Sequence, residues 1–184
     1  MTQLGLKVTN RGEWLRKKHG KRARRGWIKL HVAFDINSKQ VVSVEVTDER
    51  THDSQKAEEL VETARQKAKE KCKRVEKVIA DRGYDTHRIF RYMHERGIEP
   101  CILPRLSARI SGNIARDKVI RLIRSGKRAC KEASVYGKRW LVESFFSVFK
   151  RWFGEYVSHM KIENIRKEFM FKVLVINLFL GLGS

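Results

Sequence analysis

Apolar and polar residues alternate in two neighbouring segments near the amino terminus of the chain. Every second residue from Ile28 to Phe34 is apolar, and valines recur with the same period between residues 40 and 47. A period of two predicts strands with one buried face, and the short turn between the two segments predicts a hairpin. Residues 4–9 (LGLKVT) predict a further strand ahead of this hairpin.

Helices are predicted further along the chain by their caps and stops. The polar side chains of residues 51–54 (THDS) are typical caps, and they predict a helix that runs to about Lys73. A second helix is expected from about Thr86 to Arg96, with Asp85 as its N-cap and Gly97 as its stop.

Short apolar segments lie between and after these helices. Residues 75–80 and 98–103 predict buried strands, and Pro100 predicts that the second strand lies at a sheet edge. Residues 105–133 are basic and weakly patterned, so we expect an excursion from the fold with one helix near residues 117–124.

The order of the elements predicts the fold class. Three strands followed by alternating helices and strands require a mixed α/β sheet, in which an antiparallel meander is continued by parallel strands and flanked by helices. The chain has 184 residues and shows no internal repeat or low-complexity linker, which is typical of a single domain over residues 1–184.

A charged stripe runs along the helix predicted from Tyr136. At about 100° per residue, Tyr136, Arg139, Glu143 and Lys150 fall within an arc of about 60°, and large apolar residues fill the broad remaining face. A glutamate between an arginine and a lysine suits a site for metal ions and phosphates. A surface helix with spaced charge pairs is the simpler interpretation of the stripe taken alone.

The net charge points to a polyanionic partner. A formal charge of +20 is far from that of an ordinary folded domain and predicts nucleic acid before membrane. The densest basic run, residues 11–29, holds nine cations and two tryptophans, so we expect a mobile arm that contacts phosphates. A solvated basic loop is the alternative. The predicted DNA contacts in this run are Arg22, Arg24, Arg25 and Lys29.

Several features predict a cytoplasmic, nucleoid-associated protein without a membrane partner. The three cysteines are widely spaced, which favours free thiols in a reducing compartment. The chain shows no secretory signal. A last apolar helix, expected from about Asn164 to Leu182, is interrupted by Lys172 and Asn177 and is too short to span a bilayer.

Asp81 directly follows the fourth predicted strand. Ligands bind at the carboxyl ends of strands in α/β sheets, and a carboxylate there could face Glu143 from a packed helix. Together they would offer Mg²⁺, or Mn²⁺ as its substitute, the hard oxygen ligands that it prefers. We therefore predict Asp81 and Glu143 as catalytic and metal-binding residues, and Tyr136, Arg139 and Lys150 as DNA contacts.

Four segments match the motifs of one family in the same order. They are the spacing Tyr136-x2-Arg139-x3-Glu143-x6-Lys150, residues 25–31 (RGWIKLH), Thr47 with residues 52–54 (HDS), and residues 80–85 (ADRGYD). Together they resemble the insertion-sequence DDE transposases with a Y-R-E-K signature, in the branch of insertion-sequence families four and five. The resemblance implies a ribonuclease H-like fold and metal-dependent cleavage and transfer of double-stranded DNA at terminal repeats and target.

One segment departs from the family pattern. The first catalytic aspartate of the family lies on the first strand, and Thr2 stands at the matching position here. A hydroxyl lacks the charge to bridge two cations, so a two-ion site is expected only if a third carboxylate is supplied. Asp35 is a poor substitute because a turn aspartate needs no further explanation.

The family's amino-terminal DNA-binding region also has no counterpart in this sequence. We therefore expect a truncated or split product that is inactive alone, with a homo-oligomer or an upstream-frame product as the partner that could complete it. A non-catalytic basic nucleic-acid-binding protein and a nuclease on the same fold are the alternatives. His31 and His52 are expected to be structural, because no paired histidine spacing supports a metal site.

Overall fold

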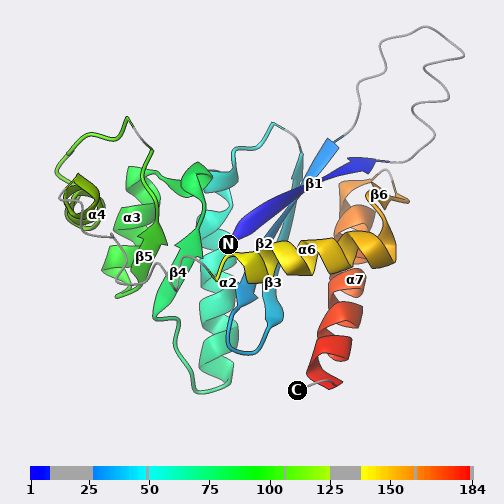
Figure 1. Cartoon of the computed structure of the whole chain (residues 1–184). Helices are drawn as coiled ribbons and strands as arrows, with labels where there is room; N and C mark the ends of the chain where they lie inside the picture. Colours follow the sequence, from blue (N-terminus) through cyan, green and yellow to red (C-terminus); the bar gives the residue numbers. More distant parts are fainter. Residues whose placement is uncertain (9–26, 49, 106, 125–137, 160, 183–184) are drawn as a thin grey trace, which may run out of the picture.

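The computed structural model describes residues 1–8, 27–48, 50–105, 107–124, 138–159 and 161–182 (Figure 1). Its helices and strands are, in chain order, β1 (Thr2–Val8), β2 (Trp27–Asp35), β3 (Gln40–Asp48), the 3-10 helix η1 (Asp53–Gln55), α2 (Ala57–Glu70), β4 (Lys77–Ala80), the 3-10 helix η2 (Arg82–Tyr84), α3 (His87–Glu95), β5 (Glu99–Ile102), α4 (Ile114–Arg124), α6 (Trp140–Phe153), β6 (Tyr156–Val157) and α7 (Ile162–Leu182).

Two sheets form the centre of the described fold. The larger has the order β3-β2-β1-β6, in which β1, β2 and β3 form an antiparallel meander and β6 joins β1 in parallel. The smaller pairs β4 with β5 in parallel. The amino group of Met1 donates a hydrogen bond to the carbonyl oxygen of Ile79, so the start of β1 lies beside β4. The predicted mixed α/β architecture is confirmed and is compatible with a ribonuclease H-like fold.

Strand β2 separates two apolar cores. Leu30 is fully buried in a core that includes Phe149 of α6 and Phe169 of α7. On the opposite face, Ala33 joins a core that includes Leu60 of α2 and several residues of α3. Side chains of a strand alternate between its faces, so this central strand holds one helical layer on each side of the sheet.

Helix α7 is attached to the edge strand β3 by Asn177. Its side-chain amide donates to the carbonyl oxygen of Val41 at 2.8 Å, and its Oδ1 accepts from the backbone N–H of Val41 at 2.9 Å. The exposed backbone of an edge strand is thereby covered, which explains a polar residue inside an apolar helix. Within the described residues, no helix is long and apolar enough to cross a membrane.

The helix predicted from residues 51–54 starts later than expected. Those residues contribute to the short helix η1, and α2 begins at Ala57 without a side-chain cap. Asp53 instead forms an ion pair with Lys29 of β2 at 3.2 Å. The prediction that residues 51–54 cap the long helix is therefore wrong, because a tertiary contact takes the side chain that local sequence assigns to the helix.

The predicted cap of α3 is also wrong. Thr86 is the N-cap, since its hydroxyl accepts a hydrogen bond from the backbone N–H of Ile89 at 3.3 Å. Asp85 is buried and binds the Arg116 guanidinium through two contacts of 2.7 and 3.1 Å. It also accepts the backbone N–H of Arg105 at 2.9 Å. This buried pair attaches α4 to the loop that follows β4.

Two predictions about the end of α3 and the strand after it are confirmed. Gly97 follows α3 with a φ of 65°, a left-handed conformation that glycine adopts without strain. Strand β5 pairs with β4, its one partner among the described strands, so Pro100 lies on an edge strand.

Removal of the Arg116 guanidinium should destabilise the fold. Arg116→Met keeps the apolar stem but leaves the buried Asp85 carboxylate without its partner. We expect the free energy of unfolding to fall by about 3 kcal/mol. Urea unfolding followed by circular dichroism measures the change.

Arg88→Met is the matched control, because Arg88 pairs with Glu58 at the surface and its side chain is 74% exposed. A much smaller loss of unfolding free energy is expected for Arg88→Met, and equal losses in the two variants would contradict the role of the buried pair.

Burial raises the pKa of Asp85, but Arg116 and the Arg105 N–H outweigh it, so the pKa lies below its usual 3.8. The stabilisation is present above pH 3.8 and is lost as pH falls through the folded value.

Candidate active site

Asp81 lies at the carboxyl end of β4, immediately before η2. Its Oδ1 accepts a hydrogen bond from the backbone N–H of Gly83 at 2.8 Å, which makes Asp81 the N-cap of η2. The backbone turn therefore fixes one carboxylate oxygen at the sheet edge where α/β proteins bind ligands.

Asp53 reaches the same place from η1. A Cβ added to Gly83 would lie 3.0 Å from Oδ1 of Asp81 and 3.3 Å from Oδ2 of Asp53, so both carboxylates face the same small volume. Lys29 holds Asp53 in position: its Nζ lies 3.2 Å from Oδ1 of Asp53 and donates to the carbonyl oxygen of Thr51 at 2.9 Å.

Two fully buried side chains carry polar atoms close to these carboxylates. The Tyr84 hydroxyl has no hydrogen-bond partner among the described residues. Burial raises the pKa of Tyr84, and the charges of Asp53 and Asp81 raise it further, so the hydroxyl lies near both. Nε2 of His31 lies 2.9 Å from the Thr47 hydroxyl, which confirms the predicted structural role of this histidine.

Arg139 and Glu143 lie at the start of α6. Nη2 of Arg139 lies 3.5 Å from Oε1 of Glu143 in an ion pair. The two side chains therefore lie on the same face, as the predicted stripe requires. Burial lowers the pKa of the Met1 amino group to about 5, while Asp81 raises it and Arg139 lowers it further. Both charges act on this one group, and Figure 1 shows the start of α6 beside the amino terminus, which the hydrogen bond to Ile79 places against β4.

The other predicted DNA contacts lie in different parts of the chain. Lys150 is in the last turn of α6, where its Nζ donates to Glu155 at 2.7 Å. It lies seven positions after Glu143 on the same helix, about 10 Å along the axis. Lys29 is engaged by Asp53, so its role at DNA remains a prediction. The predicted contacts outside the described residues are Arg22, Arg24, Arg25 and Tyr136.

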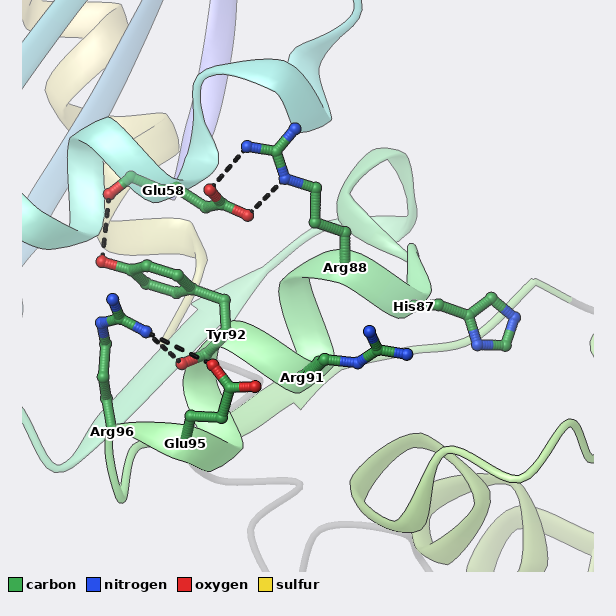
Figure 2. Close-up of a pocket in the computed structure, with 7 residues that line it drawn as sticks. All are labelled: Glu58, His87, Arg88, Arg91, Tyr92, Glu95 and Arg96. Atoms are coloured by element: carbon green, nitrogen blue, oxygen red, sulfur yellow. Dashed lines mark hydrogen bonds and ion pairs between the residues drawn. The ribbon is translucent and has the colours of Figure 1, made fainter.

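A surface hollow of about 510 Å³ lies between α2 and α3 (Figure 2). Arg88 donates two hydrogen bonds to the Glu58 carboxylate at 2.6 and 2.7 Å, and Arg96 stacks over the Tyr92 ring at 3.8 Å. The charges of this hollow are thus largely paired with each other. Its lining residues are Glu58, His87, Arg88, Arg91, Tyr92, Glu95 and Arg96, and they include no predicted site residue.

Comparison with protein families relates this arrangement to known proteins. The family model described as the transposase DDE domain matches residues 5–178, nearly the whole chain. The chain belongs to the transposase DDE domain family. The predicted DDE transposase family is thereby confirmed, and its branch of insertion-sequence families four and five stays a prediction. No solved structure matches the chain.

DDE transposases generally use divalent metals such as Mg²⁺, and the donor chemistry of this site suits them. Asp81 and Asp53 offer the hard carboxylate oxygens that Mg²⁺ prefers, and this ion keeps several waters when bound. Among the described residues, no group of three or more His, Cys, Asp or Glu side chains could hold a metal ion. Thr2, at the position where the resemblance expects an aspartate, is buried at the start of β1.

Sequence analysis missed the place of Asp53 in this transposase. We expected a helix cap, although Asp53 lies in the HDS segment that matches a family motif, and that match was the available signal. Asp35, the weaker substitute, accepts hydrogen bonds from the backbone N–H of Asn37 and the hydroxyl of Ser38. It is the turn former that its position predicts.

Transposase stability should rise with pH through the range below pH 6.5 because of His31. Burial lowers the pKa of His31 from its usual 6.5, although Asp53 opposes the shift. The unfolded chain therefore binds more protons in that range, and the folded state loses stability as pH falls. His31→Gln should reduce the slope by up to about 1.4 kcal/mol per pH unit.

Urea unfolding at several pH values between about 5 and 7.5 measures this slope. His94→Gln is the matched control, because His94 is exposed on α3. The same change of slope in both variants would contradict the assignment to His31.

Proposed function

We propose that this chain is the catalytic domain of an insertion-sequence transposase that cleaves and transfers DNA strands with a divalent cation. Its substrates are the double-stranded terminal repeats of the insertion sequence and its target DNA. The main support is that the Met1 amino group, which donates a hydrogen bond to the carbonyl oxygen of Ile79 on β4, is within reach of the charges of both Asp81 and Arg139. This supports a site between the acid that follows β4 and the end of α6 that carries Glu143.

Asp81 and Glu143 are the proposed metal ligands. With a third carboxylate, two Mg²⁺ or Mn²⁺ ions held here would activate the attacking oxygen and stabilise the leaving oxygen of the phosphodiester. Asp81 is held by the Gly83 N–H before any substrate arrives, which fixes its orientation. Glu143 has a side chain that is 63% exposed, so a phosphodiester at the surface can reach it.

Arg139 would serve as both a phosphate contact and a partner of Glu143. A surface ion pair contributes little stability, whereas arginine binds a phosphate through two strong hydrogen bonds. A DNA phosphate would therefore replace Glu143 as the ion-pair partner of Arg139, and the Glu143 carboxylate would become available to a cation. Lys150 would exchange Glu155 for a phosphate in the same way, about two helical turns away.

Introduction of a carboxylate at position 2 should activate the chain. Thr2 offers no charge for a second cation, so we expect the wild-type chain to nick supercoiled plasmid poorly with Mg²⁺ or Mn²⁺. Thr2→Asp should raise nicking about 100-fold, since a metal ion supplies several kcal/mol of transition-state stabilisation and each 1.4 kcal/mol is tenfold in rate.

Thr2→Asn is the matched control, because an asparagine side chain has the shape of aspartate but no negative charge. Asp81→Asn or Glu143→Gln in the Thr2→Asp background should remove the gain. No gain in Thr2→Asp would argue against the catalytic proposal and favour a non-catalytic basic DNA-binding protein, which the net charge of +20 also supports. Robust Glu143-dependent nicking by the wild-type chain would refute only its proposed inactivity.

The basic run is proposed to contribute most of the salt dependence of DNA binding. Replacement of Arg22, Arg24 and Arg25 by alanine should reduce the slope of log affinity against log salt by about 2 to 3, because each phosphate contact contributes about 0.9. Fluorescence anisotropy with a labelled duplex at several salt concentrations measures it.

Alanine at Lys67, Lys69 and Lys71 is the matched control for that experiment. These lysines are exposed at the end of α2, and their replacement removes the same charge. A slope that falls equally in both triple variants would show that net charge acts, with no specific contribution from the arginines.

A further inference from the structure

Two carboxylates from separate parts of the chain face one volume in front of Gly83. Oδ1 of Asp81 and Oδ2 of Asp53 lie 3.0 and 3.3 Å from the point that a Cβ on Gly83 would occupy. One acid ends β4 and the other lies in η1, which stands against β2 through Lys29. The volume therefore lies between two packed elements.

The absence of a side chain at residue 83 keeps this volume open. Gly83 has no positive φ, so its backbone conformation does not require glycine. A methyl group there would lie 3.0 Å from Oδ1 of Asp81, closer than nine in ten real Cβ contacts, so the carboxylate would have to shift. Glycine at position 83 therefore leaves the space in front of the two carboxylates unfilled, where a larger side chain would enter it.

A buried hydroxyl lies near the same volume. Tyr84 is fully buried, its hydroxyl has no hydrogen-bond partner within the described part of the chain, and the charges that act on it are those of Asp53 and Asp81. Buried hydroxyls are nearly always hydrogen-bonded, so a polar occupant is expected beside this one. A cation that carries water would provide it.

The charges around the volume favour a cation. Asp53 and Asp81 contribute two negative charges, and Lys29 supplies one positive charge to Asp53. Lys29 contacts Oδ1 of Asp53, whereas Oδ2 faces Gly83. Carboxylate oxygens are the hard ligands that Mg²⁺ prefers, and proteins often hold this ion with one or two carboxylates and several waters.

We propose that Asp53 and Asp81 together bind a divalent cation in front of Gly83, and that the Tyr84 hydroxyl orders a water of that cation. The proposal rests on the proposed function for the role of Asp81 as a metal ligand. It adds Asp53, on the η1 side of the sheet, as a further ligand of the cation that Asp81 binds, and leaves the β1 position of Thr2 without a carboxylate.

Mn²⁺ binding to the full chain without DNA tests the proposal. Electron paramagnetic resonance of free Mn²⁺ gives the affinity directly. Asp53→Asn and Asp81→Asn should each weaken binding at least about tenfold. Asp35→Asn is the matched control, since Asp35 makes its hydrogen bonds within a hairpin turn, and its affinity should equal that of the wild type.

Lys29→Met separates ligation from structural support. It breaks the same ion pair as Asp53→Asn but keeps the carboxylate, so it should weaken Mn²⁺ binding much less than Asp53→Asn does. Gly83→Ala should weaken binding at least about tenfold by filling the volume, and Tyr84→Phe should weaken it severalfold. Circular dichroism of each variant verifies that it folds.

Three outcomes would overturn the proposal. They are no measurable Mn²⁺ binding by the wild type, wild-type affinity in Asp53→Asn, or equal losses in Lys29→Met and Asp53→Asn. The proposed function fails separately: if Thr2→Asp gains no nicking while Asp53 and Asp81 still bind Mn²⁺, the cation site stands without the transposase chemistry. If nicking depends on Asp81 but Asp53→Asn binds Mn²⁺ normally, the reverse holds.

Discussion

The arrangement of this molecule depends on the burial of both faces of β2. Leu30 and its alternate neighbours pack against α6 and α7, while Lys29, His31 and Ala33 face η1, α2 and α3. One face therefore positions the helix that carries Glu143, and the other positions the short helix that carries Asp53. A one-residue shift in the register of β2 would exchange the two sets and move every group of the site.

The alternation along β2 and β3 was enough to predict the meander, because a buried face imposes a period of two wherever it occurs. The helix starts were predicted less well. Asp85 and Asp53 are residues of the type that caps helices. In the structure, however, Asp85 pairs with the buried Arg116 guanidinium, and Asp53 pairs with the Lys29 ammonium group. These two pairings join residues 31 and 24 positions apart, so no local pattern contains them. The proximity of Asp81 to Asp53 was missed for the same reason.

The large positive charge of the chain coexists with extensive local pairing. In the described residues Arg88, Arg116, Arg139 and Lys150 each contact a carboxylate, although cations outnumber acids. Buried and exposed pairs differ in their consequences. The Arg116 pair is sequestered and fixes the loop behind Asp81, whereas the Arg139 pair is accessible and can be exchanged for a phosphate. Burial thus separates the structural cations from those available to DNA.

The loop after β4 combines these constraints within five residues. Asp81 turns its carboxylate onto the Gly83 N–H, Tyr84 fills the core below, and Asp85 anchors α4. Each side chain is held by a different part of the fold, so the position of Asp81 is determined from several directions. A carboxylate held this way does not need to be ordered when a cation binds, and less entropy is lost on binding. The rigidity that stabilises the loop is therefore the same property that a metal-binding acid requires.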